Sequence, residues 1–419
     1  MNIVHIATTN TGGAGIAAWR QHEALRTIGI NSRFLCARAG AESTANSCTT
    51  CPPLVPPLWK RGLRRLLKVH DPVAKDEADT VLEIQKSGGA AEFELFSSPH
   101  ARFAPESHPW VTDADLVHLH WTTGFVDYPR FFARITKPLV WTLHDQNPYL
   151  GGFHYTLDRE HNPALHKLDD RWRTLKRKRL QSVSPLAIIG NSTWNTTAAQ
   201  ASGFFAAETR FETIFYPLDA NRFAPRDKTA AKLAFGLPVD HLIIGFASTS
   251  LRNKRKGLVD LLASIREIER SVPVALLSFG SGPTDTVKNS VSSPWIHLGY
   301  LENDDLKCAA YSAMDCFVIP SHAEAFGQTA IEALACGTPV IGSDVGGIRE
   351  ALDEGRAGLL FPVGDVGLLS KSLRRLTRDE ELRRALIESG RRLVIARHAP
   401  SINANRYRGV YESLMHKKS

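Results

Sequence analysis

Two runs of alternating strand and helix patterns constrain the fold of this 419-residue chain more than any other feature. The first run contains the apolar stretches "NIVHIA", "DLVHLHW" and "PLVWTLHD", and the second contains "LIIGFAS", "VALLSFG" and "CFVIPS". Segments with apolar residues at helical spacing, such as "GLVDLLASIREIERS", lie between these stretches. Because strands that alternate with helices form parallel sheets covered on both faces, we predict an α/β fold with two Rossmann-like domains facing each other across a cleft.

The boundary between the two domains is expected in a segment rich in proline and polar residues, residues 213–240. A chain of this length exceeds one ordinary hydrophobic core, which also favours two or three domains. We assign residues 1–215 to the first domain and residues 216–399 to the second. Residues from about 45 to 108 interrupt the alternation with many prolines and a basic segment.

The charge of the chain suits polyanionic partners. Its formal net charge of +8 is compatible with nucleic acid, anionic lipid or phosphorylated small molecules, and does not choose among them. No apolar run approaches the length of a membrane span. The first ten residues, "MNIVHIATTN", have the pattern of a first strand rather than of a signal peptide. We therefore expect a cytoplasmic protein.

The six cysteines include one C-x-x-C, formed by Cys48 and Cys51. A structural zinc site needs four ligands, and neither a second pair nor an H-x3-H follows in the sequence. Reduced cytosolic thiols and a single redox pair are the two interpretations of these residues.

The stretch "HAEAFGQTAIEALACGTPVIGSDVGGIRE" (residues 322–350) places two glutamates around a predicted helix start. It follows the strand "CFVIPS", and open α/β sheets bind ligands at the carboxyl ends of their strands. If the helix starts near Gln328, the backbone N–H groups of Phe326, Gly327 and Gln328 suit a phosphate. Glu324 and Glu332 can accept hydrogen bonds from diols. Either glutamate alone would more often be a surface charge, but together they predict a nucleotide-sugar pocket.

The order E-A-F-G, the second glutamate, and then A-C-G-T-P-V-I-G-S-D-V-G-G-I-R-E resembles the signature of the GT-B retaining glycosyltransferases of family four. The resemblance covers nearly the whole chain, including "IIGNSTW", "FYPLDANRFAPRD" and "STSLRNKRKGLVDLLASI". It implies a GT-B fold in which the last helix, residues 400–419, packs back on the N-terminal domain. "HLHW" and "WTLHDQNPYLGGFHY" resemble a subgroup that builds bacterial surface polysaccharide. Phe153 stands where close relatives often carry cysteine, which leaves the subgroup and its sugar open.

The resemblance also implies roles for individual residues. Lys256 matches a lysine that meets the donor diphosphate, and Arg252 is the candidate for the accompanying arginine. Glu324 would hold sugar hydroxyls and Glu332 the ribose. His144 follows the apolar strand "PLVWTL" and matches a histidine that the family uses at the active site, where it would steady a developing charge.

Three glycines, Gly12, Gly13 and Gly15, lie between the first strand and its helix. They predict a phosphate- or acceptor-facing turn, with Gly13 and Gly15 as binding candidates. A dinucleotide-binding fold also needs an acidic residue about 20 positions further on. The second strand, "SRFLCARAG", offers none, so dinucleotide binding is disfavoured.

Further histidines are candidates for ligand contact. His118 and His120 alternate along one strand and therefore point to the same face, where they line the cleft or pack beneath a helix. His154 and Tyr155 lie in a loop after two glycines and are candidates for contact with the acceptor.

No metal is expected at this site. Asp113 and Asp115 form a D-x-D, but it precedes a strand instead of ending one, which indicates an ordinary turn. Positive charge near the diphosphate would then come from Arg252, Lys256 and helix dipoles.

The segment "PLWKRGLRRLLKVHD" (residues 57–71) combines an apolar helical face, Trp59, Leu63, Leu66 and Leu67, with many basic residues. This pattern fits an interfacial helix on anionic lipid or a surface helix packed on its own domain. The first interpretation would place the protein peripherally at the inner face of the cell membrane.

The sequence therefore predicts an enzyme, a hexosyltransferase-type glycosyltransferase. It would move a sugar from a nucleoside-diphosphate sugar to a hydroxyl of a glycan or lipid-linked acceptor, with retention, in bacterial surface polysaccharide synthesis. The donor is a substrate, and no cofactor is expected. Two alternatives stay open: a nucleotide-sugar epimerase of the same fold, and a non-catalytic basic GT-B module that binds lipid or nucleic acid. Because aromatic and basic residues do not interleave on a strand, no nucleic-acid partner is expected.

Overall fold

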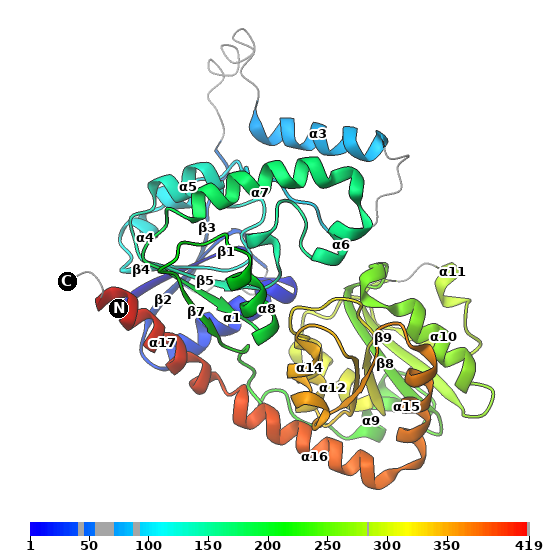
Figure 1. Cartoon of the computed structure of the whole chain (residues 1–419). Coiled ribbons are helices and arrows are strands. Elements are labelled where there is room, and N and C mark those ends of the chain that lie inside the picture. Colours follow the sequence, from blue (N-terminus) through cyan, green and yellow to red (C-terminus); the bar gives the residue numbers. More distant parts are fainter. Residues whose placement is uncertain (41–45, 55–70, 87–92, 283–284, 417–419) are drawn as a thin grey trace. The chain divides into compact units, whose positions relative to one another are not determined.

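The computed structural model describes residues 1–40, 46–54, 71–86, 93–282 and 285–416, which fall into two compact units. The first unit comprises Met1–Ile214 and Asn403–Ser419, and the second comprises Phe215–Ile402. Each unit contains one parallel sheet flanked by helices (Figure 1). The prediction of two parallel-sheet Rossmann-like domains is confirmed. The last helix, α17 (Pro400–His416), belongs mainly to the first unit, so the chain returns to that unit at its end.

The first sheet has seven strands in the order β3-β2-β1-β4-β5-β6-β7. Their bounds are β1 (Asn2–Thr9), β2 (Asn31–Arg38), β3 (Cys48–Thr50), β4 (Leu116–Leu119), β5 (Leu139–Leu143), β6 (Leu186–Gly190) and β7 (Arg210–Thr213). The order changes direction between β1 and β4, which pair from Ile3↔Leu116 to Ile6↔Leu119. Ligands of open α/β sheets bind at the carboxyl edge beside such a switch point.

Helices cover both faces of the first sheet. The helices of the first unit are α1 (Gly12–Thr27), α3 (Pro72–Lys86), α4 (Pro109–Thr112), α5 (Tyr128–Arg134), α6 (Thr156–His161), α7 (His166–Leu180), α8 (Thr193–Ala201) and α17. On one face, Ile3 packs in a core with Tyr407 and Tyr411 of α17. The next residue, Val4, belongs to the core on the opposite face, to which α5, α7 and α8 contribute. This alternation is what a strand buried on both faces requires.

One helix of the first unit lies inside the segment that interrupts the sequence pattern. Helix α3 carries a buried carboxylate, Asp76, whose Oδ2 lies 2.8 Å from His100 Nδ1. The expected interfacial helix at residues 57–71 lies, apart from Asp71, outside the described residues. Within the described ranges, every helix is too short or too polar to cross a membrane.

The second sheet has six strands in the order β10-β9-β8-β11-β12-β13. Their bounds are β8 (Leu242–Ser250), β9 (Val274–Ser281), β10 (Trp295–His297), β11 (Cys316–Ile319), β12 (Val340–Ser343) and β13 (Leu359–Phe361). The switch point of this sheet lies between β8 and β11.

The helices of the second unit follow the predicted alternation. They are α9 (Lys228–Ala234), α10 (Leu258–Ile268), α11 (Asp285–Lys288), α12 (Asp304–Ala313), α13 (Gln328–Ala335), α14 (Ile348–Ala351), α15 (Val366–Arg378) and α16 (Glu380–Arg397). Helix α10 buries Leu258, Leu261, Leu262 and Ile265, which recur at helical spacing and therefore form one apolar stripe. This stripe packs in a core with residues of β8, β11 and α15.

The six cysteines are free thiols in the described structure. Cys48 on β3 lies within hydrogen-bonding reach of Cys36 on the neighbouring β2. Cys51 instead directs its Sγ to the carbonyl oxygen of Pro52, at 3.7 Å. The two cysteines of the C-x-x-C therefore have different partners.

Candidate functional site

The loops after β8 and β11 meet beside the switch point of the second sheet. Lys256 lies at the end of the short helix η4 (Lys254–Lys256), which follows β8, and Glu324 lies in the loop after β11. Lys256 Nζ is 2.6 Å from Glu324 Oε2, and both side chains are mostly buried. The structure thus brings together two residues that stand 68 positions apart and that the sequence assigns to one site.

The backbones of these two loops are tied to each other. The N–H of His322 donates to the carbonyl of Arg255 (2.8 Å), and Arg255 donates from Nη1 to the carbonyl of Ala323. Gly257 has a φ of +69°, and a Cβ on it would overlap the carbonyl oxygen of Pro320. Sequence reasoning missed Arg255, since a buried arginine inside the run "RNKRKG" looks like any other basic residue there.

Helix α13 presents its amino end to the same loop. Its N-cap, Gly327, has a φ of +96°, and within the described residues no side chain caps the helix. The positive φ favours glycine, whereas an added Cβ would make only ordinary van der Waals contact, with Ile348 Cγ1 at 3.6 Å. The N–H of Ala330 already donates to the carbonyl of Gly327 (2.9 Å), so the N–H groups of Gln328 and Thr329 are those that suit an anion, and the helix dipole favours negative charge there.

Two glycines after β12 support the loop that carries Glu324. The N–H of Gly347 donates to the carbonyl of Glu324 (3.0 Å). A Cβ on Gly346 would overlap this carbonyl, and a Cβ on Gly347 would overlap that of Ala325. Because only glycine fits such close backbone contacts, the adjacent glycines "GG" in the sequence could have indicated that two backbones approach each other here.

Glu332 lies one turn inside α13 and is nearly buried, with 5% of its surface exposed. The hydroxyl of Tyr311 on α12 donates to its Oε2 (3.0 Å), and Gln328 Nε2 lies 3.3 Å from its Oε1. Tyr311 is itself fixed edge-on between Phe279 and Phe317. The carboxylate of Glu332 is therefore held in one orientation by a residue that the sequence did not single out.

The other two candidates of the second unit have different surroundings. The ring of Phe326 is buried against Phe215, Tyr216 and His398, so its backbone is the part that can face a ligand. Arg252 is exposed, and its N–H lies 3.3 Å from Ser250 Oγ.

In the first unit, His144 directly follows β5 at the carboxyl edge of the sheet. Its Nε2 lies 3.2 Å from Nδ1 of His120, which directly follows the neighbouring β4. Burial lowers the pKa of His144 to about 4, although the adjacent carboxylate of Asp145 opposes this shift. His144 is therefore neutral near pH 7, and a neutral imidazole ring has one nitrogen that donates and one that accepts a hydrogen bond.

The loop after His144 is held by buried polar contacts. Asp145 Oδ2 accepts from Trp121 Nε1 (2.9 Å) and lies 2.6 Å from His154 Nδ1. The second ring nitrogen of His154 lies 2.9 Å from Ser97 Oγ, so both nitrogens of this histidine have protein partners. Phe153 is buried against Phe96, which shows that an aromatic cluster fills this position.

The glycine loop lies at the carboxyl end of β1. Helix α1 starts at Gly12, and a Cβ on Gly15 would collide with the carbonyl oxygen of Thr9. At Gly13 a Cβ would meet no described atom within 4 Å. Gly15 is thus explained by packing of α1 against β1, whereas the space at Gly13 is open to a ligand.

Asp113 and Asp115 have structural partners. Asp113 caps the end of α4, and Asp115 Oδ2 accepts from the N–H of Asn2 (2.7 Å). The D-x-D therefore forms a turn before β4, as its position in the sequence indicates.

Residues 234–393 match the family model described as "Glycosyl transferases group 1". A D-inositol 3-phosphate glycosyltransferase of Saccharomonospora viridis is 29% identical over 298 residues, which cover 66% of this chain and 65% of the relative. The N-acetyl-alpha-D-glucosaminyl L-malate synthase of Bacillus anthracis is 30% identical over 211 residues, which cover 49% and 54%. The chain thus spans less than two thirds of the length of each of these relatives.

Solved structures resemble the chain over almost its whole length. Sucrose-phosphate synthase from Thermosynechococcus elongatus has a TM-score of 0.71 at 20% identity, and the comparison covers 99% of both chains. The Anabaena protein HepE in complex with UDP and glucose has a TM-score of 0.70 at 18% identity, covering 99% of this chain and 100% of HepE. The chain therefore has the GT-B fold, and its residues 234–393, which include Lys256, Glu324 and Glu332, match glycosyl transferases group 1.

Proposed function

We propose that the protein is a glycosyltransferase that uses a nucleoside-diphosphate sugar as donor. The observation that carries this proposal is the Lys256–Glu324 pair beside the amino end of α13, at the switch point of the second sheet. A cation, a helix amino end and a carboxylate are the groups that a diphosphate joined to a sugar requires. The family match over residues 234–393 covers all three.

The chemistry of the site assigns a role to each group. Negative charge grows on the leaving diphosphate in the transition state, and Lys256, Arg252 and the N–H groups of Gln328 and its neighbours would stabilise it. When a donor binds, Lys256 would share its charge between Glu324 and the diphosphate. Glu324 would accept hydrogen bonds from sugar hydroxyls. In this proposal the positive charge comes from the protein, and no metal is required.

Glu332 is proposed to hold the ribose of the donor. Tyr311 and Gln328 hold its carboxylate in one orientation, one at each oxygen. A carboxylate held in this way suits the paired hydroxyls of a ribose as a hydrogen-bond acceptor. Because HepE was solved with UDP and glucose, UDP and UDP-glucose are the first ligands to try.

The acceptor is proposed to be a hydroxyl compound that binds on the first unit near His144. The assignment to a glycan or lipid-linked acceptor of bacterial surface polysaccharide, with retention of configuration, rests on the sequence resemblance. The names of two relatives refer instead to inositol 3-phosphate and to malate. Small polar acceptors therefore belong in the test beside lipid-linked ones. Peripheral contact with an anionic membrane through residues 57–71 is a separate proposal from the sequence pattern.

An assay of product formation tests this proposal. The protein is incubated with UDP-glucose, GDP-mannose and related donors, with and without an acceptor panel, and the products are analysed. Acceptor-dependent release of a nucleoside diphosphate, abolished in Glu324→Gln and retained in Lys254→Ala, supports transfer. Lys254 is the matched control because it is exposed in the same short helix. A donor that changes without an acceptor indicates an epimerase instead. Salt-sensitive binding to polyanions without turnover indicates a basic binding module.

A further inference from the structure

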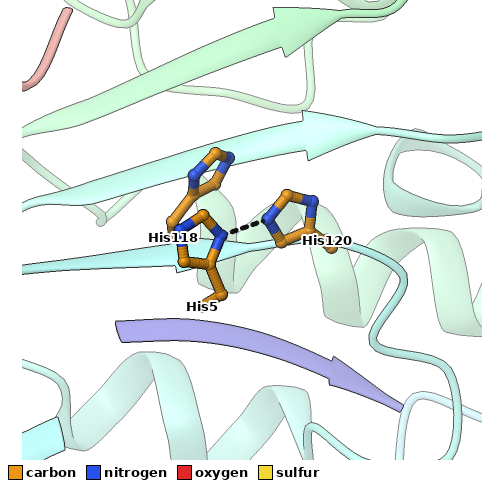
Figure 2. A group of neighbouring side chains, drawn as sticks. All are labelled: His5, His118 and His120. Atoms are coloured by element: carbon orange, nitrogen blue, oxygen red, sulfur yellow. Dashed lines mark hydrogen bonds between the residues drawn. The ribbon is translucent and has the colours of Figure 1, made fainter. Parts of the chain in front are cut away.

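Three histidines form a hydrogen-bonded chain inside the first unit. His5 lies on β1, His120 directly after β4, and His144 directly after β5. His5 Nδ1 is 2.7 Å from His120 Nε2 (Figure 2), and His120 Nδ1 is 3.2 Å from His144 Nε2. His5 and His120 are fully buried or nearly so, and the chain leads from the sheet interior to the candidate active-site histidine.

The same region contains three histidines whose nitrogens lie within 4.8 Å of one another: His5, His118 and His120. A shared metal ion would have to lie close to the plane of each ring that binds it. The rings of His118 and His120 instead stack, with centroids 4.2 Å apart and planes 29° apart, so their in-plane lone pairs do not converge on one point between them. Both nitrogens of His118 are also engaged, with Tyr411 Oη at 2.7 Å and Thr142 Oγ1 at 2.8 Å. The geometry favours a hydrogen-bonded chain over a metal centre.

The direction in which the three histidines donate their protons follows from His5, at the inner end of the hydrogen-bonded chain. A neutral imidazole has one N–H and one bare nitrogen, so each ring must donate at one side and accept at the other. His5 Nε2 is buried and has no hydrogen-bond partner within the described residues. A proton there would leave a buried N–H without an acceptor, which costs more than a bare lone pair. The proton of His5 is therefore on Nδ1 and points to His120.

The positions of the ring protons of His120 and His144 follow from that of His5. His120 accepts at Nε2 from His5, so its own proton is on Nδ1 and is donated to His144. His144 accepts at Nε2, so its own proton is on Nδ1. Burial also lowers the pKa of all three rings, to about 4 for His144, which keeps each of them neutral near pH 7.

We propose that His120 and His5 are positioning residues that hold His144 in the tautomer with its proton on Nδ1. In this state His144 accepts at Nε2 from His120, so Nδ1 is the nitrogen from which the ring donates a hydrogen bond. It would not remove a proton through Nε2. The consequence for catalysis rests on the proposed function, whereas the tautomer itself does not.

Nitrogen NMR of the full chain labelled with ¹⁵N-histidine tests the proposal directly. The signals of His144 are identified as those lost in His144→Gln. At pH 7 the wild type is expected to show a protonated Nδ1 and a bare Nε2 for His5, His120 and His144. A protonated Nε2 on His144, or a mixture of the two tautomers, overturns the proposal. A shift of the His5, His118 and His120 signals by stoichiometric Zn²⁺ would also overturn it, in favour of a metal centre.

The variant His120→Phe, which keeps a planar ring and removes both nitrogens, gives the second readout. We expect the His144 signals to lose their single tautomer and kcat to fall by about tenfold or more, with KM for the donor unchanged. The control is His22→Gln, because His22 hydrogen-bonds to Ser32 Oγ and, within the described residues, to none of the three histidines of the hydrogen-bonded chain. Unchanged His144 signals in His120→Phe contradict the proposal. If the tautomer is as expected but every donor is inert, the proposed function fails and the positioning role stands.

Discussion

At the scale of single residues, the candidate donor site depends on groups that hold its carboxylates in place. Glu332 would be a mobile surface charge if α13 stood alone, but Tyr311 fixes one of its oxygens at 3.0 Å. Glu324 is fixed twice, by Lys256 and by the glycines that support its backbone. Such supporting contacts matter because a binding group that is misplaced by about 1 Å loses much of its effect.

Removal of the Tyr311 hydroxyl tests whether its hydrogen bond to Glu332 contributes to binding. In Tyr311→Phe, Glu332 loses one hydrogen bond, so we expect the affinity for a nucleoside diphosphate to fall by roughly 3- to 10-fold, equivalent to about 1 kcal/mol. Titration calorimetry measures the change. Tyr300→Phe, at an exposed position, is the control and should leave affinity unaltered. A wild-type affinity in Tyr311→Phe would show that Glu332 needs no such support.

The glycines after β12 offer a test on stability. In Gly347→Ala the added Cβ must displace the backbone at Ala325, so we expect the free energy of unfolding of the protein to fall by about 1–3 kcal/mol. Donor affinity should fall with it, because the same backbone carries Glu324. Chemical denaturation measures the first quantity and calorimetry the second. An alanine tolerated at Gly347 without loss of either would mean that this loop adapts freely.

At the scale of elements, α17 is attached to the first sheet by buried contacts of two tyrosines. The hydroxyl of Tyr411 lies 2.7 Å from His118 Nδ1, and that of Tyr407 lies 2.7 Å from Thr142 Oγ1, all of them buried. Both tyrosines also bury their rings in the core beside Ile3. The helix is therefore fixed to the sheet by polar contacts as well as by apolar packing.

Two substitutions in α17 should have opposite effects. Tyr411→Phe leaves His118 Nδ1 without its partner and should lower the free energy of unfolding by about 1–3 kcal/mol. Gly409→Ala is expected to raise it by about 0.5–1 kcal/mol, since Gly409 lies in the helix, is exposed, and has no described atom near an added Cβ. Urea denaturation compares both with wild type. Equal stability of the two variants would contradict this description of the helix.

Much of this element-level structure is predictable from the sequence, and some of it is not. Apolar runs such as "LIIGFAS" and "CFVIPS" predict β8 and β11, and the meeting of Lys256 with Glu324 follows from strands that are neighbours in one parallel sheet. Helix α3 was missed because it lies in the segment of residues 45 to 108, where prolines and a basic stretch interrupt the alternation of strand and helix patterns. The partners of His120 were missed because the alternation along β4 shows which face the ring takes, but not which residue of β1 lies opposite.

At the scale of the whole molecule, both units bury neutral histidines, which makes stability depend on pH. Burial lowers the pKa of His22 to about 3, and those of His144 and His398 to about 4. In the unfolded chain these groups titrate near pH 6.5. Between those values the unfolded state binds more protons than the folded state, so stability is full above about pH 6.5 and is lost as the pH falls toward 4.

The size of this effect can be measured. Each such histidine should lower the free energy of unfolding by up to about 1.4 kcal/mol for each pH unit below 6. We expect the midpoint of urea denaturation to fall between pH 7 and pH 5, and to fall less steeply in His398→Gln, which lacks one of these groups. A midpoint that stays constant over this range would show that the histidines are protonated in the folded protein.

The central claim is that Lys256 and Glu324 form a site for the diphosphate of a sugar nucleotide, and one titration tests it most directly. UDP and GDP are titrated calorimetrically into wild type, Lys256→Ala and Lys254→Ala at fixed salt concentration. We predict that one nucleotide binds wild type and Lys254→Ala with similar affinity and binds Lys256→Ala roughly 10- to 100-fold more weakly, as loss of a charge-assisted contact requires. Equal affinity of all three proteins, or binding by none of them, would contradict the claim.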